Sequence, residues 1–114
     1  AERFVNYWLG EGAWLSLPVD RQEAFIFTLP NNVYEWDAIM SMDVSADVWQ
    51  GIKASTLYVR ARQTTKSITG IYQVLQDLCP HWEYVEVAEG GHMAPVTKPD
   101  LVNPLVMDFL GKAI

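Results

Sequence analysis

The sequence predicts an α/β fold, with a helical N-terminal segment followed by a β-α-β-α unit that has two parallel strands. Residues 1–53 have helical patterns and contain four of the five tryptophans. From residue 54 onward, β-rich runs alternate with amphipathic helical ones. A chain of 114 residues is one domain or part of one. We therefore expect a helical cap-like segment, 1–53, and a core segment, 54–114, within one compact unit.

The N-terminal segment is predicted to form four helices. The first, ERFVNYWL, ends at Gly10, a residue type that commonly closes a helix. The second begins near Pro18, which suits a first turn, and is expected to stop at Pro30. A third helix is predicted with Asn32 as its N-cap and Glu35 three residues later, as in a capping box. The fourth is short and covers SADVWQGI.

Two β-rich runs flank the clearest amphipathic helix of the chain. STLYVRA, residues 55–61, is uncharged until its arginine, which is typical of a buried parallel strand. WEYVEVA, residues 82–88, alternates in polarity and is expected at or near a sheet edge. Between them, the helical apolar stripe consists of Ile68, Ile71, Tyr72, Leu75, Leu78 and Cys79. The crossover between the strands should be right-handed.

The last helix is predicted to begin at Asn103. Proline is unfavourable inside a helix, so Asn103 is assigned as N-cap with Pro104 at the first helical position, leaving PDLV as a separate turn. Gly111 is expected to close the helix. Two parallel strands make a sheet too small to stand alone. Something else is therefore expected to complete the sheet.

Composition argues against several classes of partner. The net charge is −6, with eight Lys and Arg and no cluster of them, so a nucleic-acid partner is not expected. No apolar run approaches the length of a membrane-spanning helix, so no membrane association is expected either. Cys79 cannot form an internal disulfide, which favours the cytoplasm. Two histidines and one cysteine make a poor metal-ligand set, and neither a metal nor a cofactor is expected.

The second segment resembles the C-terminal part of the α/β-hydrolase fold. The resemblance rests on STLYVRA, the helix after it, and WEYVEVAEGGHMAPVTKPDLVNPLVMDFLG, in which EGGHMAPVTKPDLVN…FL is the most specific stretch. The helical text RFVNYWLGEGAWLSLPVDRQEAF resembles the cap of those hydrolases. The resemblance implies that His92 occupies the place of the family's catalytic general base.

Other parts of the family's catalytic pattern do not appear in this sequence. The nucleophile of such enzymes lies on a G-x-S-x-G turn, and none of the five serines has those neighbours. No HGGG-type oxyanion segment occurs. Thr64 stands where the resemblance would place the orienting acid, and no Asp or Glu occurs between Asp47 and Asp77. A histidine without a positioned nucleophile and acid is not a catalytic site.

Two functional hypotheses follow. The first is a truncated, non-catalytic α/β-hydrolase-like protein. It would form a homodimer through the exposed edge of its sheet and could bind a small apolar ligand or a protein partner. The alternative is the C-terminal portion of a serine-type hydrolase, in which His92 serves a nucleophile on an absent segment or another chain. Its substrate would be an ester-like compound.

Two further groups of residues have competing interpretations. Trp8, Trp14 and Trp36 could form a ligand-binding cap surface, although ordinary helix packing is the default explanation for aromatic residues there. Cys79 and His81 could pair as a thiol and a base. Cys79 continues the apolar stripe of its helix, which favours a buried, unreactive side chain.

Overall fold

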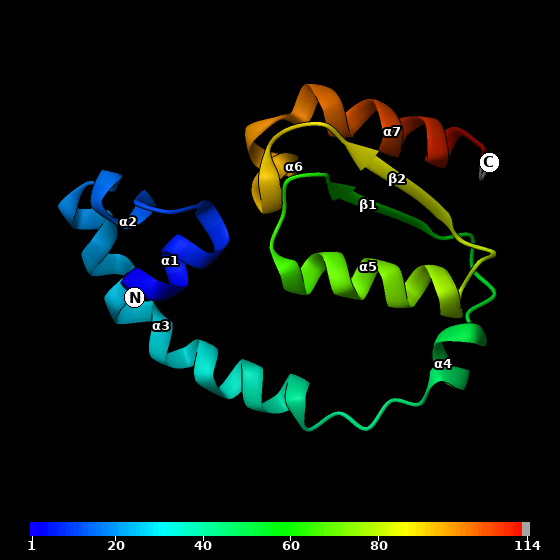
Figure 1. Ribbon diagram of the computed structural model, residues 1–114, viewed down its shortest axis with the longest axis horizontal. Helices are drawn as coiled ribbons and strands as arrows, with labels where there is room; N and C mark the ends of the chain where they lie inside the picture. The colour runs from blue at the N-terminus through cyan, green and yellow to red at the C-terminus, as the bar shows by residue number, and fades with distance from the viewer. Residues whose placement is uncertain (113–114) are drawn as a thin grey trace. The chain divides into compact units, whose positions relative to one another are not determined.

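A computed structural model describes residues 1–112 (Figure 1). The backbone divides into two compact units, residues 1–44 and the residues from 45 onward. The short helix α4 (Ala46–Gln50) thus belongs with the strands rather than with the first three helices. The sequence places the boundary between a cap-like and a core segment at residue 53, and that boundary stays a prediction. The expectation that the two segments form one compact unit also stays a prediction.

The first unit is entirely helical and has a small core. Its helices are α1 (Glu2–Leu9), α2 (Ala13–Ser16) and α3 (Val19–Met40). Val5 on α1 is the buried apolar side chain of this unit, with 2% of its surface exposed. Side-chain amides hold the turns between the helices: Asn6 Oδ1 accepts from the Trp14 amide at 2.9 Å, and Gln22 Nε2 donates to the Trp14 carbonyl at 3.1 Å.

The expected stop at Pro30 is wrong, because α3 continues through it for 22 residues. Proline removes the hydrogen bond that would reach the carbonyl of Ile26, four residues earlier. Ile26 is 57% exposed, so the loss falls on a solvated stretch where water can serve that carbonyl. The expected cap at Asn32 is wrong for the same reason. Asn32 Nδ2 instead donates to Glu35 Oε2 at 2.8 Å along the surface of the helix.

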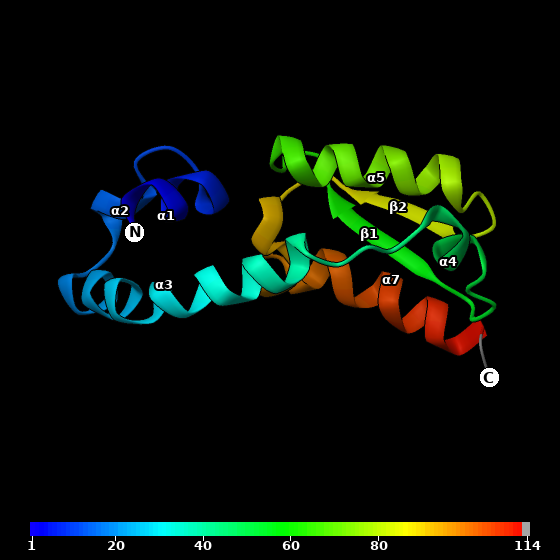
Figure 2. The same cartoon turned by 90° about the horizontal axis from the view of Figure 1, so that it is seen from below.

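The second unit is built on two parallel strands, as the sequence predicts. β1 (Leu57–Ala61) and β2 (Glu83–Val87) pair in parallel, with Leu57 opposite Glu83 and Ala61 opposite Val87. Helix α5 (Lys66–Leu78) connects them and covers one face of the sheet, while α7 (Pro99–Lys112) covers the other (Figures 1 and 2). The α/β fold class, with two parallel strands and helices, is confirmed.

The face toward α5 has an aromatic core. Leu75, Cys79 and Trp82 are buried there, and Tyr58 and Tyr84 pack against them. The Tyr84 hydroxyl donates to the carbonyls of Leu75 at 2.6 Å and Cys79 at 3.0 Å. These carbonyls lie at the end of α5 and also accept backbone bonds, from the Cys79 amide at 2.7 Å and the Trp82 amide at 3.0 Å. The Tyr84 hydroxyl thus ties β2 to the end of the helix.

The face toward α7 has smaller side chains. Its buried cluster consists of Ala61, Val87, Ala94 and Val102. Val59 and Leu105 are partly buried against the cluster. Small side chains allow α7 to approach the sheet closely. One face of the sheet is thus packed with aromatic rings and the other with small aliphatic side chains.

The predicted start of the last helix at Asn103 is wrong, since α7 begins at Pro99 and contains Pro104. The amides of Leu101 and Val102 already bond to the Lys98 carbonyl, at 3.0 and 3.3 Å. Val102 is 7% exposed in the core, so packing holds this first turn in place. The bond that Pro104 lacks would reach Asp100, an exposed residue, where water can replace it.

Cys79 is fully buried at the end of α5, with 0% of its surface exposed. We predict that Cys79→Ala lowers the free energy of unfolding by about 1 kcal/mol, because a core sulfur is lost and a small cavity is left. Val74→Ala is the matched control, since Val74 lies on the same helix and is 56% exposed. It should change stability by less than about 0.5 kcal/mol. Urea denaturation measures both, and rapid reaction of the native thiol with a bulky maleimide would contradict the burial.

Candidate functional site

The loop after β2 makes a tight turn that depends on Gly90. This residue has φ of 96°, in the left-handed region. A Cβ atom at this position would lie 2.8 Å from the Cα of Ala94 and 3.0 Å from the Cγ of Lys98. The chain then enters a short 3₁₀ turn, η1 (Gly91–Met93), and α6 (Ala94–Thr97). The close return of the backbone places His92 at the end of the sheet.

The loops that follow the two strands touch each other. The carboxyl ends of parallel neighbouring strands meet at one edge, and ligands of α/β sheets bind at such edges. The Arg62 amide donates to the Val87 carbonyl at 2.8 Å, just beyond the ladder. A Cβ built on Gly91 would lie 3.4 Å from the carbonyl oxygen of Gln63. The residues after these two, His92 and Thr64, are therefore brought to the same place.

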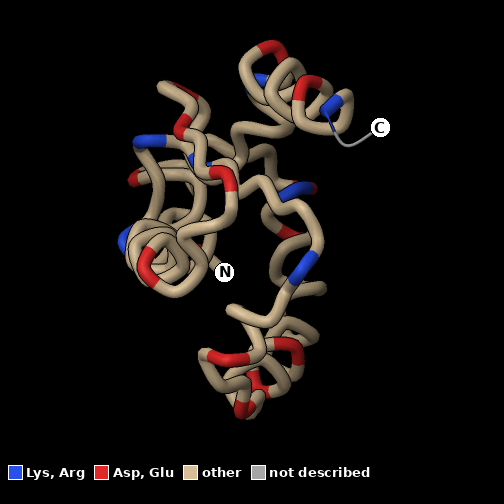
Figure 3. The backbone as a smooth tube through the Cα atoms, turned by 90° about the vertical axis from the view of Figure 1, so that its right-hand side faces the viewer, with Lys and Arg blue, Asp and Glu red and all other residues tan. Residues whose placement is uncertain are grey.

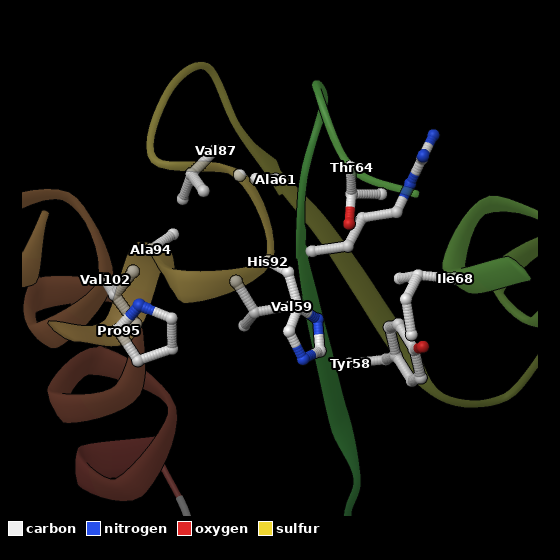
Figure 4. A pocket seen from close by; sticks show the side chains of 12 residues that line it. Tyr58, Val59, Ala61, Thr64, Ile68, Val87, His92, Ala94, Pro95 and Val102 are labelled. Atoms are coloured by element: carbon white, nitrogen blue, oxygen red, sulfur yellow. The ribbon is translucent and has the colours of Figure 1, made fainter. Parts of the chain in front are cut away.

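A pocket of about 260 Å³ lies at this edge. Its walls are mainly apolar and come from β1, the first turn of α5, the end of β2, α6 and α7 (Figure 4). The lining residues are Tyr58, Val59, Arg60, Ala61, Thr64, Ile68, Val87, Gly91, His92, Ala94, Pro95 and Val102. Such a cavity, apolar with a few polar groups, suits a small organic ligand.

Arg60 is the charged residue of the pocket wall and is firmly held. Its Nη2 lies 3.1 Å from Oε1 of Glu86, its partner across the ladder. Its Nη1 donates to the Thr69 hydroxyl at 3.3 Å, and the guanidinium lies 4.2 Å from the centre of the Tyr72 ring. With a side chain 12% exposed, the pair is shielded enough for these contacts to fix the arginine toward α5.

Burial also affects the tyrosines beside Arg60. It raises the pKa of the Tyr58 phenol, an effect that the Arg60 charge opposes. Burial likewise raises the pKa of Tyr84, with smaller contributions from Cys79 and the neighbouring tyrosines. Both phenols therefore stay neutral at physiological pH, and the Tyr84 hydroxyl donates hydrogen bonds to α5.

Two polar atoms that line the pocket are buried without a hydrogen-bond partner among residues 1–112: Thr64 Oγ1 and Arg60 Nε.

The sequence did not predict Arg60 as a residue of the pocket. The signal available was an arginine near the end of an otherwise uncharged strand, with a glutamate on the paired strand. The side chain of His92 is exposed at the pocket.

The three tryptophans assigned to a ligand-binding surface all belong to the first unit. Trp8 packs edge-on against Phe4 and Tyr7, with ring centres 6.3 and 5.0 Å away. Trp14 is half-buried, and Trp36 is 41% exposed. Packing thus accounts for Trp8, while the ligand-binding role of the group stays a prediction.

The remaining candidates are separated or scattered. Cys79 is buried, whereas His81 is exposed, with Nε2 3.3 Å from the Ile52 carbonyl oxygen.

Within the described part of the chain, no group of three His, Cys, Asp or Glu side chains could hold a metal ion. No helix described here is long and apolar enough to cross a membrane. Figure 3 shows Lys and Arg interspersed with acidic residues along the backbone.

Comparison with known proteins finds a hydrolase relative. The chain is 30% identical over 104 residues to the protein of Pantoea ananatis (strain LMG 20103) described as "Putative carbamate hydrolase RutD". The aligned region covers 90% of this chain and 38% of that protein, so the chain spans well under half the length of its relative. No family model matches the chain. No solved structure matches it either.

The similarity to a protein described as a putative carbamate hydrolase agrees with the resemblance of this chain to hydrolases. It covers both units of the present structure. The chain is therefore hydrolase-like in sequence and α/β in fold. Its correspondence to the C-terminal half of such an enzyme, and the roles of individual site residues, stay predictions.

The turn at Gly90 gives a direct test of how the site is built. We predict that Gly90→Ala lowers the free energy of unfolding by about 1–3 kcal/mol, because the methyl group meets Ala94 and the backbone is left-handed. Gly70→Ala is the control. Gly70 lies inside α5 with nothing within 4 Å of its Cβ position, so the change should stabilise the protein by about 0.5–1 kcal/mol. Equal effects in urea denaturation would show that the turn is not constrained.

Proposed function

We propose that this chain provides the general-base histidine of a hydrolase active site, and that the nucleophile and acid lie outside these 114 residues. The observation that carries the proposal is the place of His92. It lines a pocket at the carboxyl ends of two parallel strands, within a chain similar over 104 residues to a hydrolase. The substrate class is an ester-like or carbamate-like acyl compound, the second suggested by the name of the relative.

The chemistry needs a base within hydrogen-bond reach of a hydroxyl, with its second nitrogen held in one tautomer. The tight turn at Gly90 and the contact of Gly91 with Gln63 fix the backbone on which His92 stands. The apolar wall formed by Val59, Val87 and Val102 could receive the hydrocarbon part of a substrate. His92 would take the proton of the nucleophile and pass it to the leaving group.

By itself the chain is proposed to be non-catalytic. The sequence contains no G-x-S-x-G turn and no HGGG segment. Among the residues that line the pocket, Thr64 and Tyr58 have hydroxyl groups and none is a serine or a cysteine. Thr64, moreover, follows the strand in the place where the resemblance puts the acid.

The test uses the complete open reading frame that contains these codons. We expect the encoded protein to hydrolyse short-chain aryl esters or carbamates, and His92→Gln to lower kcat by at least about 10³-fold because the base is lost. His81→Gln should leave kcat within twofold, since His81 lies on another loop. The 114-residue chain should show no turnover and no labelling by a fluorophosphonate.

A reading frame without a nucleophile motif, or full activity of the His92→Gln protein, would contradict the hydrolase proposal. Labelling of a serine in the 114-residue chain would contradict the proposed lack of catalysis. These results separate the two functional hypotheses, because only a hydrolase portion requires His92 for turnover.

A second candidate function, self-association, rests on the free edge of β1. Within residues 1–112 the sheet has two strands, so the outer edge of β1 has no strand partner. Four consecutive residues of this strand, 58–61, line the pocket, which therefore follows the edge.

We predict that the isolated chain forms a homodimer at low micromolar concentration, measured by sedimentation or light scattering. Ile68→Lys places a charge beside the β1 edge and should weaken the dimer at least tenfold. Phe27→Lys is the control, because Phe27 is 84% exposed on α3, a helix of the first unit that contributes nothing to the sheet. A stable monomer with a cooperative thermal transition would rule out self-association.

The remaining expectations belong to the same proposal. The pocket is of a size to hold a small apolar ligand, and the wall toward α7 offers only aliphatic contacts among its described residues. The cytoplasm suits the free thiol of Cys79. No nucleic-acid or membrane partner is proposed.

A further inference from the structure

The hydrogen bonds at the two ends of the ladder show which residues of β1 turn their backbone polar groups outward. At one end the Glu83 amide donates to the Thr56 carbonyl at 2.9 Å. At the other end the Arg62 amide donates to the Val87 carbonyl at 2.8 Å. The backbone of a strand repeats every two residues, so the even-numbered residues from 56 to 62 face β2. The amides and carbonyls that point along the free edge are those of Leu57, Val59 and Ala61.

An edge with this pattern is complementary to a second copy of itself. A two-fold axis at Val59, the middle residue of the outward-facing row, makes the two β1 strands antiparallel. Val59 then faces Val59 of the second copy, and Leu57 faces Ala61. Each facing pair exchanges two amide–carbonyl bonds, so all three outward-facing residues are satisfied. An axis at residue 58 or 60 pairs only two of the three within the strand.

The side chains favour the same position of the axis. On the face toward α5, Tyr58 of each copy lies opposite Arg60 of the other, with Cβ atoms about 5 Å apart. A guanidinium beside a tyrosine ring is attractive. The ring also offers its face to Arg60 Nε–H, which is buried without a hydrogen-bond partner among residues 1–112. An axis at residue 60 places the two Arg60 side chains opposite each other instead, where like charges repel.

The pocket lies where such a second strand would run. Residues 58–61 of β1 line it, and neighbouring strands of a sheet are about 4.8 Å apart. Figure 4 shows Val59 and Tyr58 directed to opposite sides of β1, so alternate side chains of an added strand enter both sides of the pocket. His92 lines the same pocket and is covered when the second strand is present.

We propose that two copies of this chain pair through antiparallel β1 strands about a two-fold axis at Val59, and that the β1 strand of each copy fills the pocket of the other. The proposal rests on the self-association proposed above and names the contacts that produce it. The pocket with His92 is then open in the monomer and closed in the dimer. The hydrolase proposal does not depend on this pairing.

The first test is disulfide crosslinking of the 114-residue chain under mild oxidation. Val59→Cys should give a linked dimer, because the Cα atoms of a facing, hydrogen-bonded pair lie about 5.5 Å apart, within disulfide range. Leu57→Cys should not, because the two copies of residue 57 are four residues apart along the strands, about 14 Å. Native Cys79 is fully buried and stays in every variant. Phe27→Cys, 84% exposed on α3, gives the level of nonspecific linkage.

A second measurement needs no added cysteine. Tyr58→Leu should weaken the dimer about tenfold in sedimentation, because each dimer loses two contacts between a ring and a guanidinium. Tyr34→Leu is the matched control, since Tyr34 is 78% exposed on α3 and should leave the dissociation constant within twofold. Urea denaturation of both variants shows that each chain is folded.

Closure of the pocket is read from the two histidines of the chain. Diethyl pyrocarbonate modifies exposed imidazoles, and mass spectrometry assigns the site. In the linked Val59→Cys dimer, modification of His92 should be at least fivefold slower than in the reduced, diluted monomer. His81 is the internal control and should react equally in both, since it lies beside Ile52 and does not line the pocket.

The outcomes separate this proposal from the others. A dimer in which Leu57→Cys links to Val59→Cys, while Val59→Cys alone does not, would move the axis to residue 58 and overturn the proposed pairing. Equal reactivity of His92 in the linked and reduced forms would overturn closure of the pocket. A monomer at every concentration would overturn both the pairing and self-association, and would leave the hydrolase proposal intact.

Discussion

The parallel pairing of β1 with β2 is the constraint on which the second unit depends. The five-residue ladder from Leu57–Glu83 to Ala61–Val87 brings the carboxyl ends of both strands to one edge. The loops that follow are then neighbours, although Thr64 and His92 are far apart in the sequence. Without the pairing, neither the contact of Gly91 with Gln63 nor a pocket containing both side chains would exist.

The two faces of this small sheet are stabilised by side chains of different size and polarity. Toward α5, bulky rings such as Trp82 and Tyr84 fill the core, and the hydroxyl of Tyr84 ties β2 to the end of the helix. Toward α7, alanine and valine allow close packing. Arg60 crosses from the ladder to the aromatic face, where Glu86 and Tyr72 neutralise its charge and support its plane. The polar and apolar walls of the pocket thus belong to two separately packed layers.

The sequence predicted the α/β class, both strands, the helix between them and the location of His92 because each depends on local periodicity or a specific motif. It failed at Pro30 and Pro104, where proline was taken to end or begin a helix. In both helices the carbonyl that loses its hydrogen bond belongs to an exposed residue. In α7 the buried side chain of Val102 also holds the turn before Pro104 in a helical conformation. The pairing of Arg60 with Glu86 could not be predicted, since it requires the strand register, which a single strand pattern does not give.

The same strand geometry divides the β1 residues that line the pocket between the two faces of the sheet. Side chains alternate across a strand, so Val59 and Ala61 face α7 while Tyr58 and Arg60 face α5. Past Ala61 the strand ends, and Thr64 lies on a loop that no longer follows this alternation. The Thr64 hydroxyl can therefore reach the pocket without following the alternation that directs neighbouring β1 side chains to opposite faces of the sheet. The loop after β1 therefore brings Thr64 to the edge of the sheet to which the short loop after β2 brings His92.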